Sequence, residues 1–168
     1  CHYQGTWSDR NSNRLHEFGG SDETVDVLLN AGQFTAYLSW WETTPGGLTD
    51  HDYDLVLVDA TGNEVARSGF TQNGDDQPLD VLVAYVPAAG NYGLRIEYVS
   101  GPAVHNDILQ LFTDNVPLEA THQKPQSSLV VPAAAQGSYT VGATRGVLTT
   151  GSPHGDLPID ALEPFSSL

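Results

Sequence analysis

The stretch "TDHDYDLVLVDATGNE", residues 49–64, alternates polar with apolar side chains and closes on a turn signal. In a β-strand successive side chains point to opposite faces, so Leu55 and Leu57 are predicted to share the core face. Asp54 and Asp59 then fall at the polar margins of the strand. Gly and Asn within "ATGN" favour a tight turn. The stretch therefore predicts the first strand and the turn of a β-hairpin.

Six more strand-like segments lie around this one, separated by turns and loops rich in Gly, Pro, Asn and Asp. The 17 Gly, 10 Pro, 7 Tyr and 3 Trp of the 168-residue chain also favour an all-β fold with many turns. We therefore expect an all-β, antiparallel β-sandwich, jelly-roll-like and of about seven strands. The expected strands are TVDVLLN (24–30), FTAYLSWWE (34–42), YDLVLVD (53–59), EVARSG (64–69), LDVLVAYV (79–86), YGLRIEYVS (92–100) and HNDILQLFTD (105–114).

Acidic residues dominate the charge of the chain. There are 21 Asp and Glu against 6 Lys and Arg, which gives a formal net charge of −15. This charge excludes nucleic acid and anionic membranes as partners, and it suits cation binding or solubility in extracellular surroundings. Cys1 is the single cysteine, so no intrachain disulfide can form. No apolar run is long enough to predict a membrane-spanning helix.

The aspartates at the start of the hairpin match a calcium loop only in part. Asp50, Asp52 and Asp54 occupy the first three ligand positions of an EF-hand loop. Leu55 stands where that loop needs glycine, and Thr61 stands where it needs a bidentate Glu. The stretch is therefore not an EF-hand.

These aspartates allow two interpretations. On one strand they would share a face about 6.5 Å apart, where carboxylates repel one another unless a turn, protonation or a cation intervenes. Either Asp50 and Asp52 lie in the loop and Asp54 enters the strand, or a cation neutralises them. The second interpretation is a calcium site at these residues, with help from Asp75 and Asp76 of the "NGDD" loop. A catalytic carboxylate pair is not assigned to these aspartates, because nothing else in the sequence marks an acid–base site.

Trp40 and Trp41 are adjacent near the end of a predicted strand. Aromatic faces stack on sugar rings, so either Trp is a candidate anchor for a carbohydrate. Alternation places the two rings on opposite faces, so at most one can face a ligand. The alternative is that one lies in the core and the other packs under a loop. No pair of histidines has the spacing of a zinc site.

The segments "LVVPAAAQGSYTVGAT" (129–144) and "DALEPFSSL" (160–168) follow one another late in the chain. In this order they resemble the catalytic domain of subtilisin-like serine peptidases. In that family a Pro-Ala segment precedes a buried strand ending in Val-Gly-Ala, and a loop then leads to Phe-Ser-Ser. Residues 132–133, 141–143 and 165–167 match these three elements.

The middle of the chain carries a second resemblance. The segments "YDLVLVDATGNEVARS" (53–68) and "VPAAGNYGLRIEYVSG" (86–101) resemble hairpins of pre-peptidase C-terminal and P-type domains, which are β-sandwiches of secreted peptidases. The opening "HYQGTWSDRNSNRLHEF" (2–18) is similar to passages that lead into inserted domains of such peptidases. The resemblance implies a lead-in from the peptidase core at 1–19, an inserted β-sandwich at 20–115, a linker at 116–128 and a short fragment of the α/β subtilisin-type core at 129–168.

This resemblance implies an internal region of a secreted endopeptidase, whose parent hydrolyses peptide bonds by Ser/His/Asp chemistry. The family's Asp, His, oxyanion Asn and Gly-Thr-Ser nucleophile match no position here, and Leu168 departs from the commoner Arg or Asn. No residue is therefore assigned as catalytic, and the chain alone is expected to be inactive. The expected partners are the rest of the catalytic domain and protein substrates. The alternative is a non-catalytic carbohydrate- or protein-binding β-sandwich module.

Overall fold

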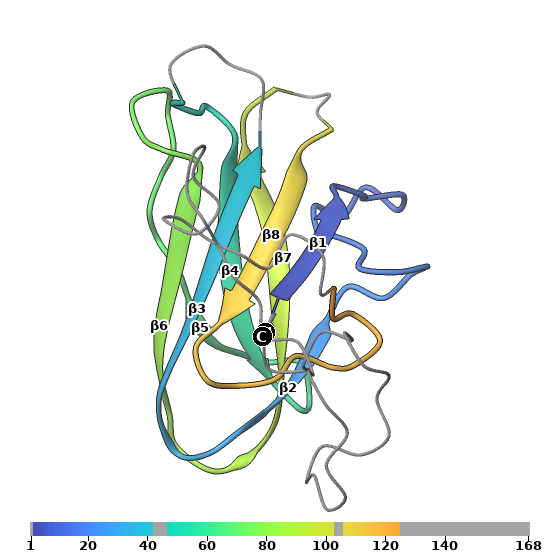
Figure 1. The fold of residues 1–168 in the computed structure, drawn as a ribbon, viewed down its shortest axis with the longest axis vertical. Helices are drawn as coiled ribbons and strands as arrows, with labels where there is room; N and C mark the ends of the chain where they lie inside the picture. The colour runs from blue at the N-terminus through green and yellow to red at the C-terminus, as the bar shows by residue number, and fades with distance from the viewer. Residues whose placement is uncertain (1, 42–46, 103–105, 125–168) are drawn as a thin grey trace, which may run out of the picture. The chain divides into compact units, whose positions relative to one another are not determined.

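The computed structural model of the protein describes residues 2–41, 47–102 and 106–124. Within these ranges the chain forms β-strands and turns, and no helix that could span a membrane occurs there. The predicted catalytic-domain fragment at 129–168 lies outside the described residues. The strands are β1 (His2–Thr6), β2 (Val25–Leu29), β3 (Gly32–Trp41), β4 (Asp52–Asp59), β5 (Glu64–Arg67), β6 (Leu79–Val86), β7 (Gly90–Ser100) and β8 (Ile108–Thr113) (Figure 1).

The strands form two antiparallel four-stranded sheets. Sheet A has the order β1-β8-β3-β6, and sheet B has the order β2-β7-β4-β5. Every consecutive connection passes from one sheet to the other except β4 to β5, which is a hairpin. This alternation between sheets is the topology of a jelly roll, one of the ways in which antiparallel proteins arrange their sheet edges. The all-β, jelly-roll-like sandwich predicted from the sequence is confirmed.

All seven strands expected from the sequence are present, and β1 is an additional one. It pairs with β8 from His2 opposite Phe112 to Thr6 opposite Ile108, within the segment predicted to be an irregular lead-in. The sandwich also continues past 115, because Leu118 is buried and forms a bridge with Val27 of β2. The compact unit spans Cys1–Gln123 and includes the predicted insert at 20–115.

The core lies between the two sheets and follows the alternation of each strand. Buried and accessible residues alternate along β2, β3, β6 and β8. In β4, by contrast, all residues from Asp52 to Val58 are buried. Leu55 and Leu57 belong to the core cluster, as the sequence predicted. β4 is thus covered on both faces, and with β7 it is one of the two inner strands of sheet B.

The turn after β4 is held by the side chain of Asp59. Its carboxylate accepts hydrogen bonds from the backbone N–H groups of Thr61 at 2.8 Å and Asn63 at 3.0 Å. The carboxylate also accepts a hydrogen bond from the Thr61 hydroxyl at 2.7 Å. This third bond is the largest of the contributions that together lower the pKa of Asp59 to about 2. Gly62 adopts a positive φ of 85°, which glycine reaches without strain. The hairpin predicted for this stretch is therefore closed by local polar contacts.

His16 is a polar residue in a fully buried position next to β1. Its Nδ1 accepts a hydrogen bond from the backbone N–H of Ser8 at 3.2 Å, which leaves Nε2 to donate to the Tyr3 hydroxyl at 2.9 Å. Burial lowers the pKa of His16 to about 4. The side chain is therefore neutral at pH 7, and both ring nitrogens are used to fix the segment that follows β1.

Acidification is expected to destabilise the sandwich through His16. The folded-state pKa of about 4 lies below the ordinary 6.5, so the unfolded chain takes up the proton first. The stabilisation is complete above pH 6.5 and is lost as the pH falls through about 4, by about 3 kcal/mol in total. Urea unfolding between pH 4 and 7 should show this loss in the native chain and a flatter profile in His16→Gln. Identical pH profiles would contradict the assignment.

Candidate functional site

The start of β4 gathers buried carboxylates. We call Asp52, Asp54, Asp80 and Asp107 together the acidic end of β4. Asp107 accepts a hydrogen bond from the Tyr53 hydroxyl at 2.6 Å. Asp52 accepts a hydrogen bond from the backbone N–H of Gln72 at 3.3 Å. The four carboxylates come from two strands, β4 and β6, and from the loop before β8, and each is less than a tenth exposed.

Asp80 is the most deeply buried member of this group. It sits on β6 at a core-facing position and accepts hydrogen bonds from the Ser68 hydroxyl and from the backbone N–H of Leu55 on β4. It therefore ties sheet A to sheet B. Burial raises the pKa of Asp80, and its Oδ1 has no hydrogen-bond partner within the described part of the chain. Asp80 was not among the site residues predicted from the sequence, although its spacing from Leu82 places it on the core face.

Arg67 lies on the outer face of sheet B among three carboxylates. Its guanidinium lies 2.9 Å from Asp54, 3.0 Å from Glu64 and 2.7 Å from Glu97. Burial raises the pKa of Asp54, and the contacts with Arg67 oppose that rise. A carboxylate held in this way is neutralised by protein, so Asp54 acts as a structural group.

The predicted calcium ligands are only partly brought together. The backbone of Thr49 pairs with Asp76 at 2.9 Å, so the "NGDD" loop does lie beside the entry to β4. Asp75 and Asp76 are exposed, whereas Asp52 and Asp54 are buried and hydrogen-bonded to protein. Calcium binding by Asp50, Asp52, Asp54, Asp75 and Asp76 stays a prediction.

One group of three metal-ligating side chains does converge among the described residues. It consists of Asp22, Glu119 and His122, whose ligand atoms all lie within 4.8 Å of one another. None of the three was predicted as a ligand from the sequence. Asp22 and His122 are a hundred positions apart, and only the folded chain shows that they meet.

Trp40 and Trp41 lie on opposite faces, as alternation predicted. Trp40 is buried, packs edge-on against Tyr53 and donates a hydrogen bond to the Thr49 hydroxyl at 3.3 Å. Trp41 is 72% exposed and is therefore not packed under a loop. Of the two candidate anchors for a carbohydrate, the structure leaves Trp41 accessible and assigns Trp40 to the core.

Trp41 belongs to a larger surface, which we call the uncharged face. It consists of the outward-facing residues of sheet A, which the strand register places on one side. None of them is Asp, Glu, Lys or Arg, although the chain carries a net charge of −15. Trp41, Tyr37, Tyr85, Val83, Leu79 and Ile108 are exposed on it. Its residues are His2, Gln4, Thr6, Gln33, Thr35, Tyr37, Ser39, Trp41, Leu79, Val81, Val83, Tyr85, Ile108, Gln110 and Phe112.

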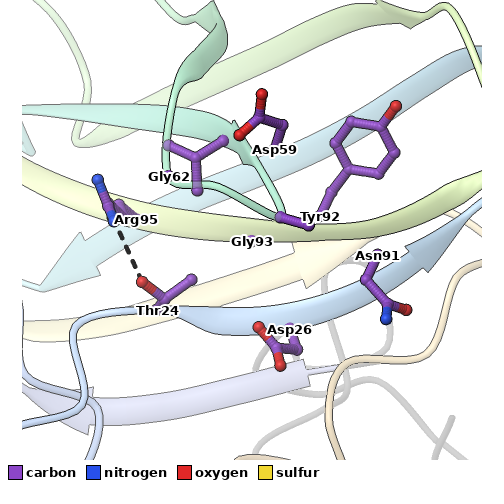
Figure 2. A pocket seen from close by; sticks show the side chains of 10 residues that line it. Thr24, Asp26, Asp59, Gly62, Asn91, Tyr92, Gly93 and Arg95 are labelled. Atoms are coloured by element: carbon purple, nitrogen blue, oxygen red, sulfur yellow. Dashed lines mark hydrogen bonds between the residues drawn. The ribbon is translucent and has the colours of Figure 1, made fainter.

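The outer face of sheet B is hollowed at one end by a shallow pocket of about 360 Å³. Figure 2 shows Gly93 on β7 between the hydrogen-bonded pair Arg95 and Thr24 and the side chain of Asn91. A Cβ atom at position 93 would collide with Thr24 Cγ2 and lie 3.2 Å from Val58 Cγ2. The glycine is therefore explained by the packing of Thr24 across β7, and it needs no ligand.

A scan against protein-family models finds no match to this chain, and a search of curated proteins finds none that matches significantly. The acidic end of β4 holds the sheets together, and the uncharged face is the surface on which a partner could be bound.

Proposed function

We propose that this chain is an internal region of a secreted subtilisin-like serine endopeptidase, in which the β-sandwich is a non-catalytic accessory domain. The observation that carries the proposal is the order of two peptidase-like segments, 129–144 and 160–168, after the sandwich. The compact unit ends at Gln123, shortly before the first of these segments begins. This division is the one expected where an accessory domain precedes a part of the catalytic domain.

The chemistry of the sandwich supports a non-catalytic role. The carboxylates at the acidic end of β4 are buried and engaged by Ser68, Tyr53, Arg67 and backbone N–H groups. Acyl transfer needs a nucleophile, a base and oxyanion donors around an accessible reacting atom. Buried, hydrogen-bonded carboxylates serve stability instead. Peptide-bond hydrolysis therefore belongs to the parent enzyme in this proposal.

The accessory role that the geometry favours is docking. Exposed apolar side chains on a soluble protein mark binding surfaces when they form a contiguous patch. Trp41, Tyr37 and Tyr85 bring large, rigid contact areas to the uncharged face, and Ile108 lies directly opposite Trp41 in the strand register. We propose that this face docks a protein, either the catalytic domain of the parent or its substrates.

The inactivity of this region is tested with a serine-directed covalent phosphonate probe. The probe should label the full parent enzyme on a serine in a Gly-Thr-Ser motif downstream of Leu168. It should leave every serine of the 168-residue chain unlabelled, because none of them lies in the Gly-Thr-Ser motif that carries the nucleophile in this family. Mass spectrometry of tryptic peptides locates the label, with heat-denatured protein as the control. Labelling within the chain, or an unlabelled parent, would refute the proposal.

A second candidate function is binding of a neutral polysaccharide on the same face. The observation that favours it is the mixture of aromatic rings with amide and hydroxyl groups and the lack of charged residues. Gln4, Gln33, Ser39 and Gln110 lie beside the aromatic side chains in the strand register. Amides and hydroxyls can both donate and accept hydrogen bonds, which suits the hydroxyls of an uncharged sugar.

Under this second candidate, Trp41→Ala should weaken binding by about tenfold or more, because the exposed indole would lose its stacking contact. Leu28→Ala is the matched control, since Leu28 is equally exposed but lies on sheet B. Affinity electrophoresis and tryptophan fluorescence across a panel of neutral polysaccharides measure the effect. An unresponsive native chain, or equal binding by native and Trp41→Ala proteins, removes the candidate.

A further inference from the structure

We propose that Asp22, Glu119 and His122 form a binding site for one divalent cation of the zinc class. The site lies where the loop before β2 meets the segment after β8. It involves neither the uncharged face nor the acidic end of β4, and it does not depend on the proposed peptidase origin.

The distances fit a metal ion. His122 Nε2 lies 3.1 Å from Asp22 Oδ2 and 3.7 Å from Glu119 Oε2. Ligand atoms about 2.1 Å from a tetrahedral zinc ion are about 3.4 Å from one another. The two observed separations bracket this value, so small side-chain movements would place all three atoms around one ion.

The carboxylates are oriented by their other oxygen atoms. Asp22 Oδ1 accepts a hydrogen bond from the backbone N–H of Thr24 at 3.1 Å. Glu119 Oε1 accepts one from the Thr121 hydroxyl at 2.7 Å. These contacts leave Oδ2 and Oε2 facing the same imidazole nitrogen. Contacts of this kind, made by the non-ligating atom of a ligand, are those that orient metal ligands in proteins.

The backbone around the three residues is also fixed. Asp22 donates its N–H to the carbonyl of Gly19 at 3.0 Å, and Glu119 donates its own to the carbonyl of Asp26 at 3.0 Å. His122 donates its N–H to the Glu119 carbonyl at 3.0 Å, which closes a turn and places both side chains on one side. The ligands are therefore supplied by two segments that the fold already holds together.

Burial and charge favour a cation at this place. The His122 side chain is 10% exposed and forms the floor, while the Asp22 and Glu119 side chains are 47% and 39% exposed and leave access from solvent. Two carboxylates that face one nitrogen repel each other, and an ion between them removes that repulsion. One nitrogen and two oxygen ligands suit zinc and its neighbours, whereas calcium prefers oxygen ligands alone.

The test uses the complete chain, Zn²⁺ for affinity and stability, and Co²⁺ as a spectroscopic substitute. The native chain should bind one equivalent of Zn²⁺ here, melt at a higher temperature than in chelator, and develop a visible Co²⁺ absorption. His122→Gln and Asp22→Asn should each weaken binding at least tenfold and abolish the absorption. Asp26→Asn is the matched control, because it removes a nearby exposed carboxylate without removing a ligand.

Melting in chelator first establishes that each variant folds, and Asp22→Asn serves if His122→Gln does not, since Asp22 is the more exposed. The proposal is overturned if the native chain shows no zinc-dependent rise in melting temperature and no Co²⁺ absorption. It is equally overturned if the ligand variants bind Zn²⁺ as tightly as the native and Asp26→Asn proteins.

Discussion

The central constraint in this fold is the burial of β4 on both faces. The strand pairs with β7 along its whole length and with β5 beyond its middle. Its inward side chains Tyr53, Leu55 and Leu57 are fully buried, and each buried side chain of this size stabilises the fold by about 1.5–3 kcal/mol. Since the hairpin turn and the inter-sheet contact to Asp80 both involve β4, sheet B and its attachment to sheet A depend on this strand.

The same burial explains why the acidic residues at the start of β4 have elaborate partners. A charged group without compensation in an apolar interior costs several kcal/mol, so it is retained only with hydrogen bonds or an ion pair. Asp54 is met by Arg67, Asp107 by Tyr53, and Asp80 by Ser68 and the Leu55 backbone. Of the aspartates that cluster in the sequence, Asp54 forms an ion pair between β4 and β5, whereas Asp80 and Asp107 reach the same place from other parts of the chain.

Much of this architecture could be predicted from local patterns. The period of two identified seven strands, placed Leu55 and Leu57 in the core and separated Trp40 from Trp41. β1 was missed because "HYQGT" has little apolar content, and its strand character comes from pairing with β8. The uncharged face could not be predicted, because it is defined only by the register of four strands. The contact between Asp22 and His122 could not be predicted either, because it joins segments far apart in the sequence. The burial of Asp80 could have been predicted, since it alternates with Leu82 along the strand. Its contact with Ser68 could not, because it joins two different segments of the fold.

The distribution of charge separates two kinds of surface on one small sandwich. The outer face of sheet B carries Arg67, Arg95 and several carboxylates, whereas the outward residues of sheet A carry no charged Asp, Glu, Lys or Arg side chain. A net charge of −15 keeps most of the surface from nonspecific association. On the uncharged face, by contrast, six large apolar side chains are exposed without a neighbouring Asp, Glu, Lys or Arg on the same face of the sheet.

Amide hydrogen exchange tests the central role of β4 most directly. If β4 organises a single cooperative sandwich, its amides and those of β7 should exchange most slowly, at the rate set by global unfolding. The amides of β1 should be protected as well, because β1 belongs to the same unit. The account is contradicted if β4 exchanges as fast as the exposed loop at 73–76, or if β1 is unprotected while β8 is protected.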